Sequence, residues 1–385
     1  MAMLDGHARA LVVRDRTAWA DGLDPAPQAQ VFSDQQRRVF QNLAELPLSA
    51  WWYRLRSPVT DAGVLAFAAS RLGARVVIVQ IDFEYALAGV DPLPTVKHQW
   101  LTAARRTGGW KLSGDSDAVT AGGRSWRGPW DFGQLRVRRG PHTLVVAHPA
   151  HAGELSTYAA LVEQAIRVVS RVWSTHWNDD VGVLIPDDAA EFAQLSADSG
   201  EIRDLAALAV ADRVAPDGTV IGARIVLNPD TLSELDGDGR VLVVRHELTH
   251  VASRAATGDQ MPSWVVEGFA DYVGNLGAAR PVRAIASELG AEIRRRGVPP
   301  ALPGSADFDA AGARLPQAYE EAWLACRLIA RLVGEQGLVR FYRAVSTASR
   351  SDPSTAVAVG LHRVLRSSVA DFTRAWRSDL AIEFR

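Results

Sequence analysis

The segment Val243 to Ala252 constrains the fold and chemistry of this 385-residue chain more than any other. Apolar residues recur in it at helical spacing, and His246 and His250 lie four positions apart. That spacing places both imidazoles on one face of a helix, one turn apart, where they can share a metal ion. Glu247 lies between them in sequence, so its carboxylate can reach a metal-bound water without itself binding the metal. The segment therefore predicts a helix that carries two metal ligands and a general base.

A third ligand is predicted in the segment Met261 to Tyr272. Pro262 suits the start of a helix, and Glu267 lies one turn inside that helix. Residues 251–266 separate Glu267 from His250, which is enough chain for a helix end, a short loop and a return on an antiparallel helix. Two histidines and one glutamate leave a fourth position for water, as in a catalytic zinc site. We therefore expect one Zn²⁺ per chain.

Asp271 follows Glu267 by four residues and therefore shares its helix face. Its carboxylate can accept the outer N–H of a ligand histidine, and we expect His246 to be that partner. Such a contact would fix the tautomer and the orientation of the imidazole. The alternative is a surface aspartate with no role at the metal.

The N-terminal part of the chain predicts helices followed by an antiparallel sheet, which is an α+β unit. Helical spacing is found at residues 8–20 and 28–44. Strand-like segments follow at 51–55, 75–87, 98–104 and 110–113. Residues 114–133 are rich in Gly, Ser and Asp, so the domain boundary is expected there. We therefore predict an N-terminal domain over 1–116 and a linker over 117–140.

The second predicted domain covers residues 141–385 and combines a small mixed sheet with a helical half. Its expected strands are 143–147, 181–185, 205–211 and 224–227. Its expected helices are 155–173, 189–195 and almost the whole chain after residue 241. Strand 224–227 is expected to accept an extended peptide as an added strand.

Composition limits the partners and the compartment. The 42 basic residues are balanced by 44 acidic residues without a long run of either sign, which argues against nucleic acid as a partner. No segment approaches the ~18 consecutive apolar residues of a membrane-spanning helix. The N-terminus lacks the features of a secretory signal, so a cytoplasmic location is expected for the chain as it stands. The one cysteine, Cys326, lies in an apolar helical run, which favours a buried hydrophobe over a catalytic thiol.

The two motifs resemble those of the gluzincin zinc metallopeptidases. His-Glu-x-x-His followed by Trp264-x-x-Glu267-Gly268-x-Ala is similar to the peptidase-MA-like group related to aminopeptidase N and thermolysin. The resemblance covers residues 141–385 and implies a peptide or protein substrate cleaved by metal-activated water. It also implies that a tyrosine on a later helix donates to the oxyanion, and Tyr319 matches that element. The alternative for Tyr319 is an amphipathic residue that caps a core helix.

Two further implications follow from this resemblance. Relatives of aminopeptidase N carry a Gly-x-Met-Glu-Asn strand whose glutamate binds the free amine of the substrate, but the corresponding stretch 222–228 has no carboxylate. The resemblance therefore implies a peptidase that is not an aminopeptidase. The N-terminal domain is similar to nuclear-transport-factor-two-like folds. Bacterial relatives carry an N-terminal membrane anchor, so a trimmed chain would work outside the cytoplasm.

Two other functions stay open on the sequence. A peptidase fold can persist without turnover and serve as a binding protein, although an intact Glu247 counts against that interpretation. The same site can also hydrolyse a non-peptide amide or ester. The other histidines considered have no partner at ligand spacing and are expected to be surface or hydrogen-bonded residues: His98, His142, His148, His151, His176 and His362.

Overall fold

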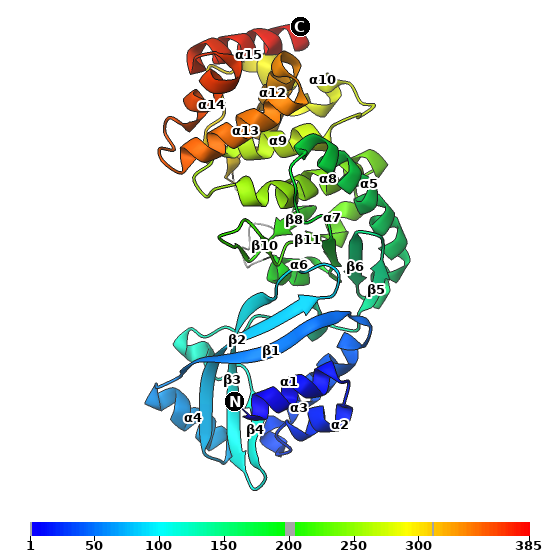
Figure 1. Cartoon of the computed structure of the whole chain (residues 1–385), viewed down its shortest axis with the longest axis vertical. Coiled ribbons are helices and arrows are strands. Elements are labelled where there is room, and N and C mark those ends of the chain that lie inside the picture. Colours follow the sequence, from blue (N-terminus) through cyan, green and yellow to red (C-terminus); the bar gives the residue numbers. More distant parts are fainter. Residues whose placement is uncertain (1, 197–204, 310–311) are drawn as a thin grey trace.

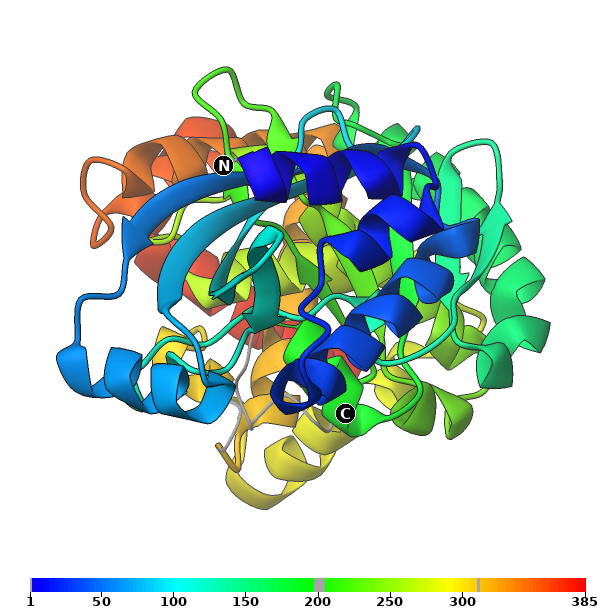
Figure 2. The same ribbon diagram turned by 90° about the horizontal axis from the view of Figure 1, so that it is seen from below.

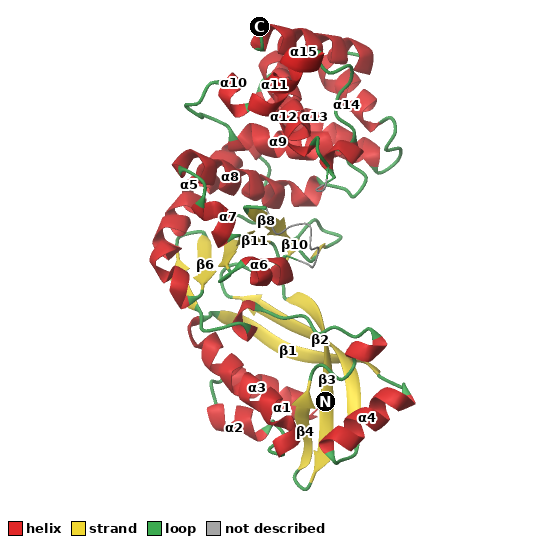
Figure 3. Ribbon diagram, turned by 180° about the vertical axis from the view of Figure 1, so that it is seen from behind, coloured by secondary structure: helices red, strands yellow, loops and turns green. Residues whose placement is uncertain are grey.

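The computed structural model describes residues 2–196, 205–309 and 312–385. Figure 1 shows an elongated molecule with the two termini towards opposite ends. A long antiparallel sheet with its helices occupies one end, a smaller mixed sheet lies in the middle, and a helical region forms the other end (Figures 1 and 3). The expected α+β class, with an N-terminal antiparallel sheet and a helical C-terminal half, is confirmed.

Three helices open the chain: α1 Ala2–Val12, α2 Arg16–Asp21 and α3 Gln30–Asn42. The prediction of one helix over 8–20 is wrong, because Arg14 adopts a left-handed backbone conformation with φ 59°. Asp15 then starts a new helix, since its side chain accepts a hydrogen bond of 2.9 Å from the backbone N–H of Ala18. The chain therefore turns between α1 and α2.

The first sheet is an antiparallel meander of four strands: β1 Leu48–Pro58, β2 Val76–Leu87, β3 Thr95–Arg106 and β4 Gly109–Gly114. Figure 2 shows this sheet curving beside α1 to α3. Alternate residues such as Trp51, Phe83 and Tyr85 turn inward and bury an aromatic core. Helix α4 Ala62–Leu72 joins β1 to β2 and was not predicted, although Asp61 caps its start and Gly73 ends it with φ 60°.

Residues 117–140, expected to be a linker, are packed against both sheets. Trp130 is 3% exposed, and its ring lies edge-on to Tyr85 with centroids 5.2 Å apart. Strand β5 Arg136–Arg139 pairs with the second sheet. The buried core of the N-terminal part also includes Leu144 and Val226 of that sheet. The division of the chain into domains at this stretch stays a prediction.

The second sheet is mixed, as predicted, with strand order β5-β6-β7-β11-β8. Its inner strands β6 Thr143–Ala147, β7 Val181–Ile185 and β11 Arg224–Leu227 are parallel, while β5 and β8 Ala207–Val210 are antiparallel edges. A small hairpin, β9 Arg213–Val214 with β10 Val220–Ile221, follows β8. The helices of this region are α5 Leu155–Trp173, α6 Ala189–Leu195 and α7 Pro229–Ser233.

From α8 onward the regular elements among the described residues are helices, which confirms the predicted helical half (Figure 3). They are α8 Gly237–Ser253, α9 Ser263–Gly274, α10 Val282–Ile285, α11 Ser287–Arg296, α12 Leu315–Val333, α13 Glu335–Ser349, α14 Ala356–Leu365 and α15 Val369–Glu383. Within the described part of the chain, no helix combines the length and apolarity needed to cross a membrane.

Candidate metal centre

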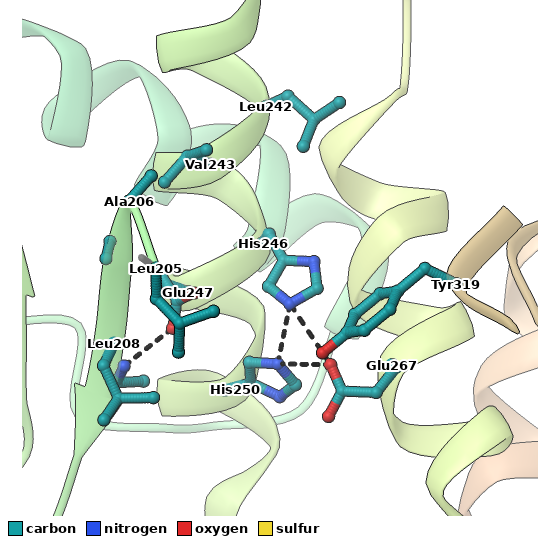
Figure 4. Close-up of a pocket in the computed structure, with 12 residues that line it drawn as sticks. Leu205, Ala206, Leu208, Leu242, Val243, His246, Glu247, His250, Glu267 and Tyr319 are labelled. Atoms are coloured by element: carbon teal, nitrogen blue, oxygen red, sulfur yellow. Dashed lines mark hydrogen bonds and ion pairs between the residues drawn. The ribbon is translucent and has the colours of Figure 1, made fainter. Parts of the chain in front are cut away.

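Helix α8 carries the two histidines of the first motif. Asp236 caps its start, because its side chain accepts a hydrogen bond of 2.7 Å from the backbone N–H of Gly239. Val244 and Leu248, four residues apart, are fully buried in the main core and anchor one side of the helix. His246 and His250 lie on another face, which opens into a pocket (Figure 4).

Helix α9 brings Glu267 to the two imidazoles. The Nε2 atoms of His246 and His250 lie 3.0 Å apart, and Oε2 of Glu267 lies 3.3 Å from each of them. Ligand atoms bound tetrahedrally to zinc at 2.0–2.1 Å lie about 3.3 Å from one another. The three donor atoms therefore fit one zinc ion, and the three residues that would hold it line the pocket.

Asp271 supports the first histidine from the side away from the pocket. Its Oδ1 atom lies 2.8 Å from Nδ1 of His246. Since Glu267 is close to both histidines and Asp271 to the earlier one, α9 runs antiparallel to α8. Burial acts to lower the pKa of His246, but Asp271, Glu267 and Glu247 raise that pKa well above its usual range. The pocket therefore stabilises a positive charge at this position.

Glu267 is held as a carboxylate. Burial acts to raise its pKa, but His250 and His246 together bring that pKa below its usual range. An ionised carboxylate is the form that binds a metal. The charge state of Glu267 therefore suits a metal ligand.

Glu247 turns towards the sheet instead of joining the three donor atoms. Its Oε2 atom accepts a hydrogen bond of 2.6 Å from the backbone N–H of Ala209 on β8, and its residue is 8% exposed (Figure 4). Its carboxylate thus lies between the helix of the two histidines and the edge strand. A carboxylate held in one position at the pocket wall can serve as a general base.

Tyr319 reaches the pocket from α12. Its ring centroid lies 6.2 Å from that of His246 and 5.4 Å from that of Phe308, which packs edge-on against it. Figure 4 shows its hydroxyl next to the carboxylate of Glu267. Burial and the carboxylates of Glu267, Asp271 and Glu247 raise the pKa of Tyr319 above its usual range. The hydroxyl therefore keeps its proton and can donate it in a hydrogen bond.

The sequence motif contains a glycine whose role only the structure reveals. A Cβ atom on Gly268 would lie 2.4 Å from the carbonyl oxygen of Ala322 and 3.0 Å from Sγ of Cys326. Only glycine allows α9 and α12 to approach so closely, and this approach brings Tyr319 beside Glu267. Cys326 is fully buried at this contact, as predicted, and burial raises the pKa of its thiol.

The pocket beside the cluster has a volume of about 420 Å³ and is bounded on one side by the edge of the second sheet. The prediction that strand 224–227 accepts a peptide is wrong, because β11 pairs with β7 on one side and β8 on the other. The free edge belongs to β8. The backbone N–H of Asn228 donates to the carbonyl of Ala206, so the backbone groups of Ala206 face β11. Because these groups alternate along an antiparallel strand, those of Ala207 and Ala209 face the pocket instead.

The residues that line this pocket are mainly apolar. Among the described lining residues, Glu247 and Glu267 are the carboxylates, and neither lies on the edge strand. The two histidines and Tyr319 also line the pocket (Figure 4). Its apolar part is formed by Leu205, Ala206, Ala207, Leu208, Ala209, Leu242 and Val243.

The other histidines are not part of this centre. His98 lies 3.0 Å from Asp82, and the buried His148 lies 2.9 Å from Glu191, so both have hydrogen-bond partners. His142 behaves differently, since it lies near Asp179 and Asp180 and these three side chains form a second cluster with metal-ligand spacing. Sequence reasoning missed this cluster, because the start of β6 meets the start of β7 only in the folded sheet.

Solved structures to which the chain is similar include an M1 zinc metallopeptidase and a hydrolase. The M1 zinc metallopeptidase from Deinococcus radiodurans is 19% identical with a TM-score of 0.39, and the match covers 71% of this chain and 58% of that one. A variant of that enzyme bound to a Tyr-Ser-Ala substrate is 16% identical with a TM-score of 0.39 and the same coverage. Native yeast LTA4 hydrolase is 13% identical with a TM-score of 0.36, over 64% of this chain and 38% of that one.

No protein-family model matches the chain, and no curated protein matches it in sequence. The chain spans 58% of the length of the Deinococcus radiodurans enzyme. A likeness of this degree does not assign an activity, so the function is inferred from the site itself.

Proposed function

We propose that the chain is a zinc-dependent peptidase that cleaves within peptides and does not require a free N-terminus. The observation that carries this proposal is the set of donor atoms of His246, His250 and Glu267, which lie 3.0 to 3.3 Å apart with Glu247 beside them. Two histidines, one carboxylate and an open position are the ligand set of a catalytic zinc.

The roles of the side chains follow from their positions. Zinc, when bound, supplies a Lewis acid that activates water and polarises a carbonyl. Glu247 takes a proton from the attacking water and passes it to the leaving amine. The hydroxyl of Tyr319 donates a hydrogen bond to the developing oxyanion. Asp271 holds Nδ1 of His246, so Nε2 of that imidazole stays directed into the pocket.

The substrate is proposed to bind as an extra strand on the free edge of β8. The backbone of Ala207 and the carbonyl of Ala209 face the pocket, while the N–H of Ala209 is held by Glu247. A peptide in extended form can pair with these free backbone groups whatever its side chains. The apolar lining by Leu205, Leu242 and Val243 favours apolar side chains near the cleaved bond. Among the described residues that line the pocket, none on β8 is a carboxylate that could bind a substrate amine, which supports cleavage away from the N-terminus.

The proposal is tested by incubating zinc-loaded protein with casein and with a fluorogenic peptide blocked at both ends. The wild type is expected to cleave both substrates, whereas Glu247→Gln keeps its zinc and loses at least about a thousandfold in kcat. Glu234→Gln, an exposed glutamate outside the pocket lining, serves as the matched control and retains activity.

Each other result identifies an alternative. Cleavage of unblocked peptides alone would show an exopeptidase. Equal zinc without cleavage in the wild type would favour a binding protein, and turnover of small amides or esters alone would favour a non-peptide hydrolase.

A further inference from the structure

The N-terminal part of the molecule contacts two inner strands of the second sheet, β11 and β7. Arg224 on β11 pairs with Asp91 of the β2–β3 connection at 2.5 Å between Nη2 and Oδ2, and their side chains are 5% and 1% exposed. Asn178 beside β7 donates a hydrogen bond of 3.0 Å to the carbonyl of Val90 in the same connection. The inner strands are therefore fixed to the N-terminal sheet by buried polar contacts.

The edge strand has its own contact with that sheet. Asp212 follows the end of β8 by two residues, and its carboxylate pairs with the ammonium of Lys97 on β3. The other carboxylate oxygen accepts a hydrogen bond of 3.2 Å from the backbone N–H of Val96. Lys97 also lies over the ring of Trp126 at 5.4 Å from its centroid, which restricts where the ammonium can go.

The same strand holds the proposed general base, because the backbone N–H of Ala209 donates to Glu247. Only Val210 and Ala211 separate Ala209 from Asp212. A shift of Asp212 therefore moves the backbone group that orients Glu247 and the edge on which a substrate would pair.

We propose that Lys97 and Asp212 are positioning residues through which the N-terminal sheet holds β8 in place beside Glu247. In this arrangement the N-terminal part contributes to the site without touching the substrate. The effect on β8 stands on the contacts alone, whereas its effect on catalysis rests on the proposed peptidase function.

The Lys97 contact is the better one to break. Removing Arg224 would leave a buried carboxylate without a partner and endanger the fold. Lys97 is 26% exposed and Asp212 is 12% exposed, so Lys97→Met leaves a carboxylate that water can reach. Arg71→Met is the control, since Arg71 pairs with Asp117 within the N-terminal part, where the two side chains are 34% and 4% exposed. Asp117 keeps a second partner in this variant, because the hydroxyl of Thr102 donates to it at 2.6 Å.

Hydrogen exchange of the zinc-loaded protein tests the positioning without any need for activity. We expect the amides of β8 to exchange at least about tenfold faster in Lys97→Met than in wild type, with unchanged rates in Arg71→Met and restoration in Lys97→Arg. Equal exchange of β8 in Lys97→Met and Arg71→Met would overturn the proposal.

Kinetics test the consequence for the site. With a short and a long peptide that share one cleavage site, Lys97→Met is expected to lose about tenfold in kcat/KM on the long peptide, chiefly through KM, and less on the short one. A purely structural role would lower kcat equally for both peptides and would contradict the proposal. If the wild type cleaves neither peptide, the peptidase assignment fails, and the exchange result decides the positioning separately.

Discussion

Among the residues that the structure describes, two clusters of His, Asp and Glu have ligand atoms within 4.8 Å of one another, yet they differ in burial and in their neighbours. In the cluster of His246, His250 and Glu267 the side chains are 12%, 22% and 21% exposed and project from two packed helices. Asp271 and Tyr319 contact this cluster from outside the set of donors.

The surface cluster of His142, Asp179 and Asp180 has side chains that are 47%, 46% and 42% exposed. Nδ1 of His142 lies 3.3 Å from Asp180 and 3.8 Å from Asp179, at the ends of two strands. Such pairs are screened by water and gain little from their proximity. The helical cluster differs from the surface cluster by its burial and by its support from neighbouring side chains, so we expect the metal there.

Removing one ligand from each cluster is expected to show the largest difference in zinc affinity. His250→Ala is expected to weaken zinc binding at least about a thousandfold, because two remaining ligands cannot hold the ion. His142→Ala is expected to bind one zinc per chain with wild-type affinity. Competition with a chromophoric chelator measures both. Equal zinc loss in the two variants would remove the distinction between the clusters.

A second difference is the hydroxyl that faces the helical cluster. Tyr319→Phe is expected to lower kcat by about 10² to 10³ without changing zinc affinity, because only the donor to the oxyanion is lost. Tyr272→Phe on α9, which does not line the pocket, is the control and is expected to keep its kcat. A wild-type kcat in Tyr319→Phe would show that the hydroxyl does not act in catalysis and that the tyrosine serves in packing.

Support from outside the ligand set has a smaller effect. Asp271→Asn is expected to weaken zinc binding by about 10 to 100-fold, because the imidazole of His246 loses the carboxylate that orients it. The matched change in the surface cluster, Asp180→Asn, is expected to leave the zinc affinity as it is. If both variants bind zinc like the wild type, the contact with Asp271 does not contribute to zinc affinity, and burial alone would distinguish the two clusters.

A buried carboxylate in the helical half has only an exposed partner, unlike Glu267 with its two histidines. Glu321 is 1% exposed, its partner Arg314 is 56% exposed, and burial raises the pKa of Glu321 to about 7. Since the folded state then holds this proton more tightly than the unfolded state, stability falls as the pH rises from about 4.5 to about 7. Glu321→Gln is expected to reduce this fall and to be about 2 kcal/mol more stable at pH 8.

Urea unfolding at pH 5 and pH 8 measures this effect. Glu320 has its own pKa raised to about 7, so the variant keeps part of the slope. Glu234→Gln, an exposed position, is expected to behave like the wild type. A steeper fall in Glu321→Gln would show that its carboxylate is stabilised by charge.

The parts of the site that depend on helix periodicity were predictable from the sequence. His246, His250 and Glu267 come together because spacings of four residues and a short return fix neighbouring positions on α8 and α9. The place of Asp271 beside His246 follows from the same geometry.

The parts that depend on strand order were not predictable. Strand β8 precedes β11 in the chain but lies outside it in the sheet, so the free edge that holds Ala209 was assigned to the wrong strand. The meeting of His142 with Asp179 depends on the parallel pairing of β6 and β7, and sequence spacing does not encode it. The packing of Trp130 against Tyr85 likewise joins residues far apart in the sequence, and the composition of residues 114–133 does not reveal it.

Zinc is expected to occupy the helical cluster and to leave the surface cluster empty. Diffraction data collected on both sides of the zinc absorption edge, from crystals of protein loaded with one equivalent of zinc, test it most directly. The account predicts one anomalous peak within about 2.0–2.2 Å of His246, His250 and Glu267 and none beside His142. A peak beside His142 with none between α8 and α9 would contradict it.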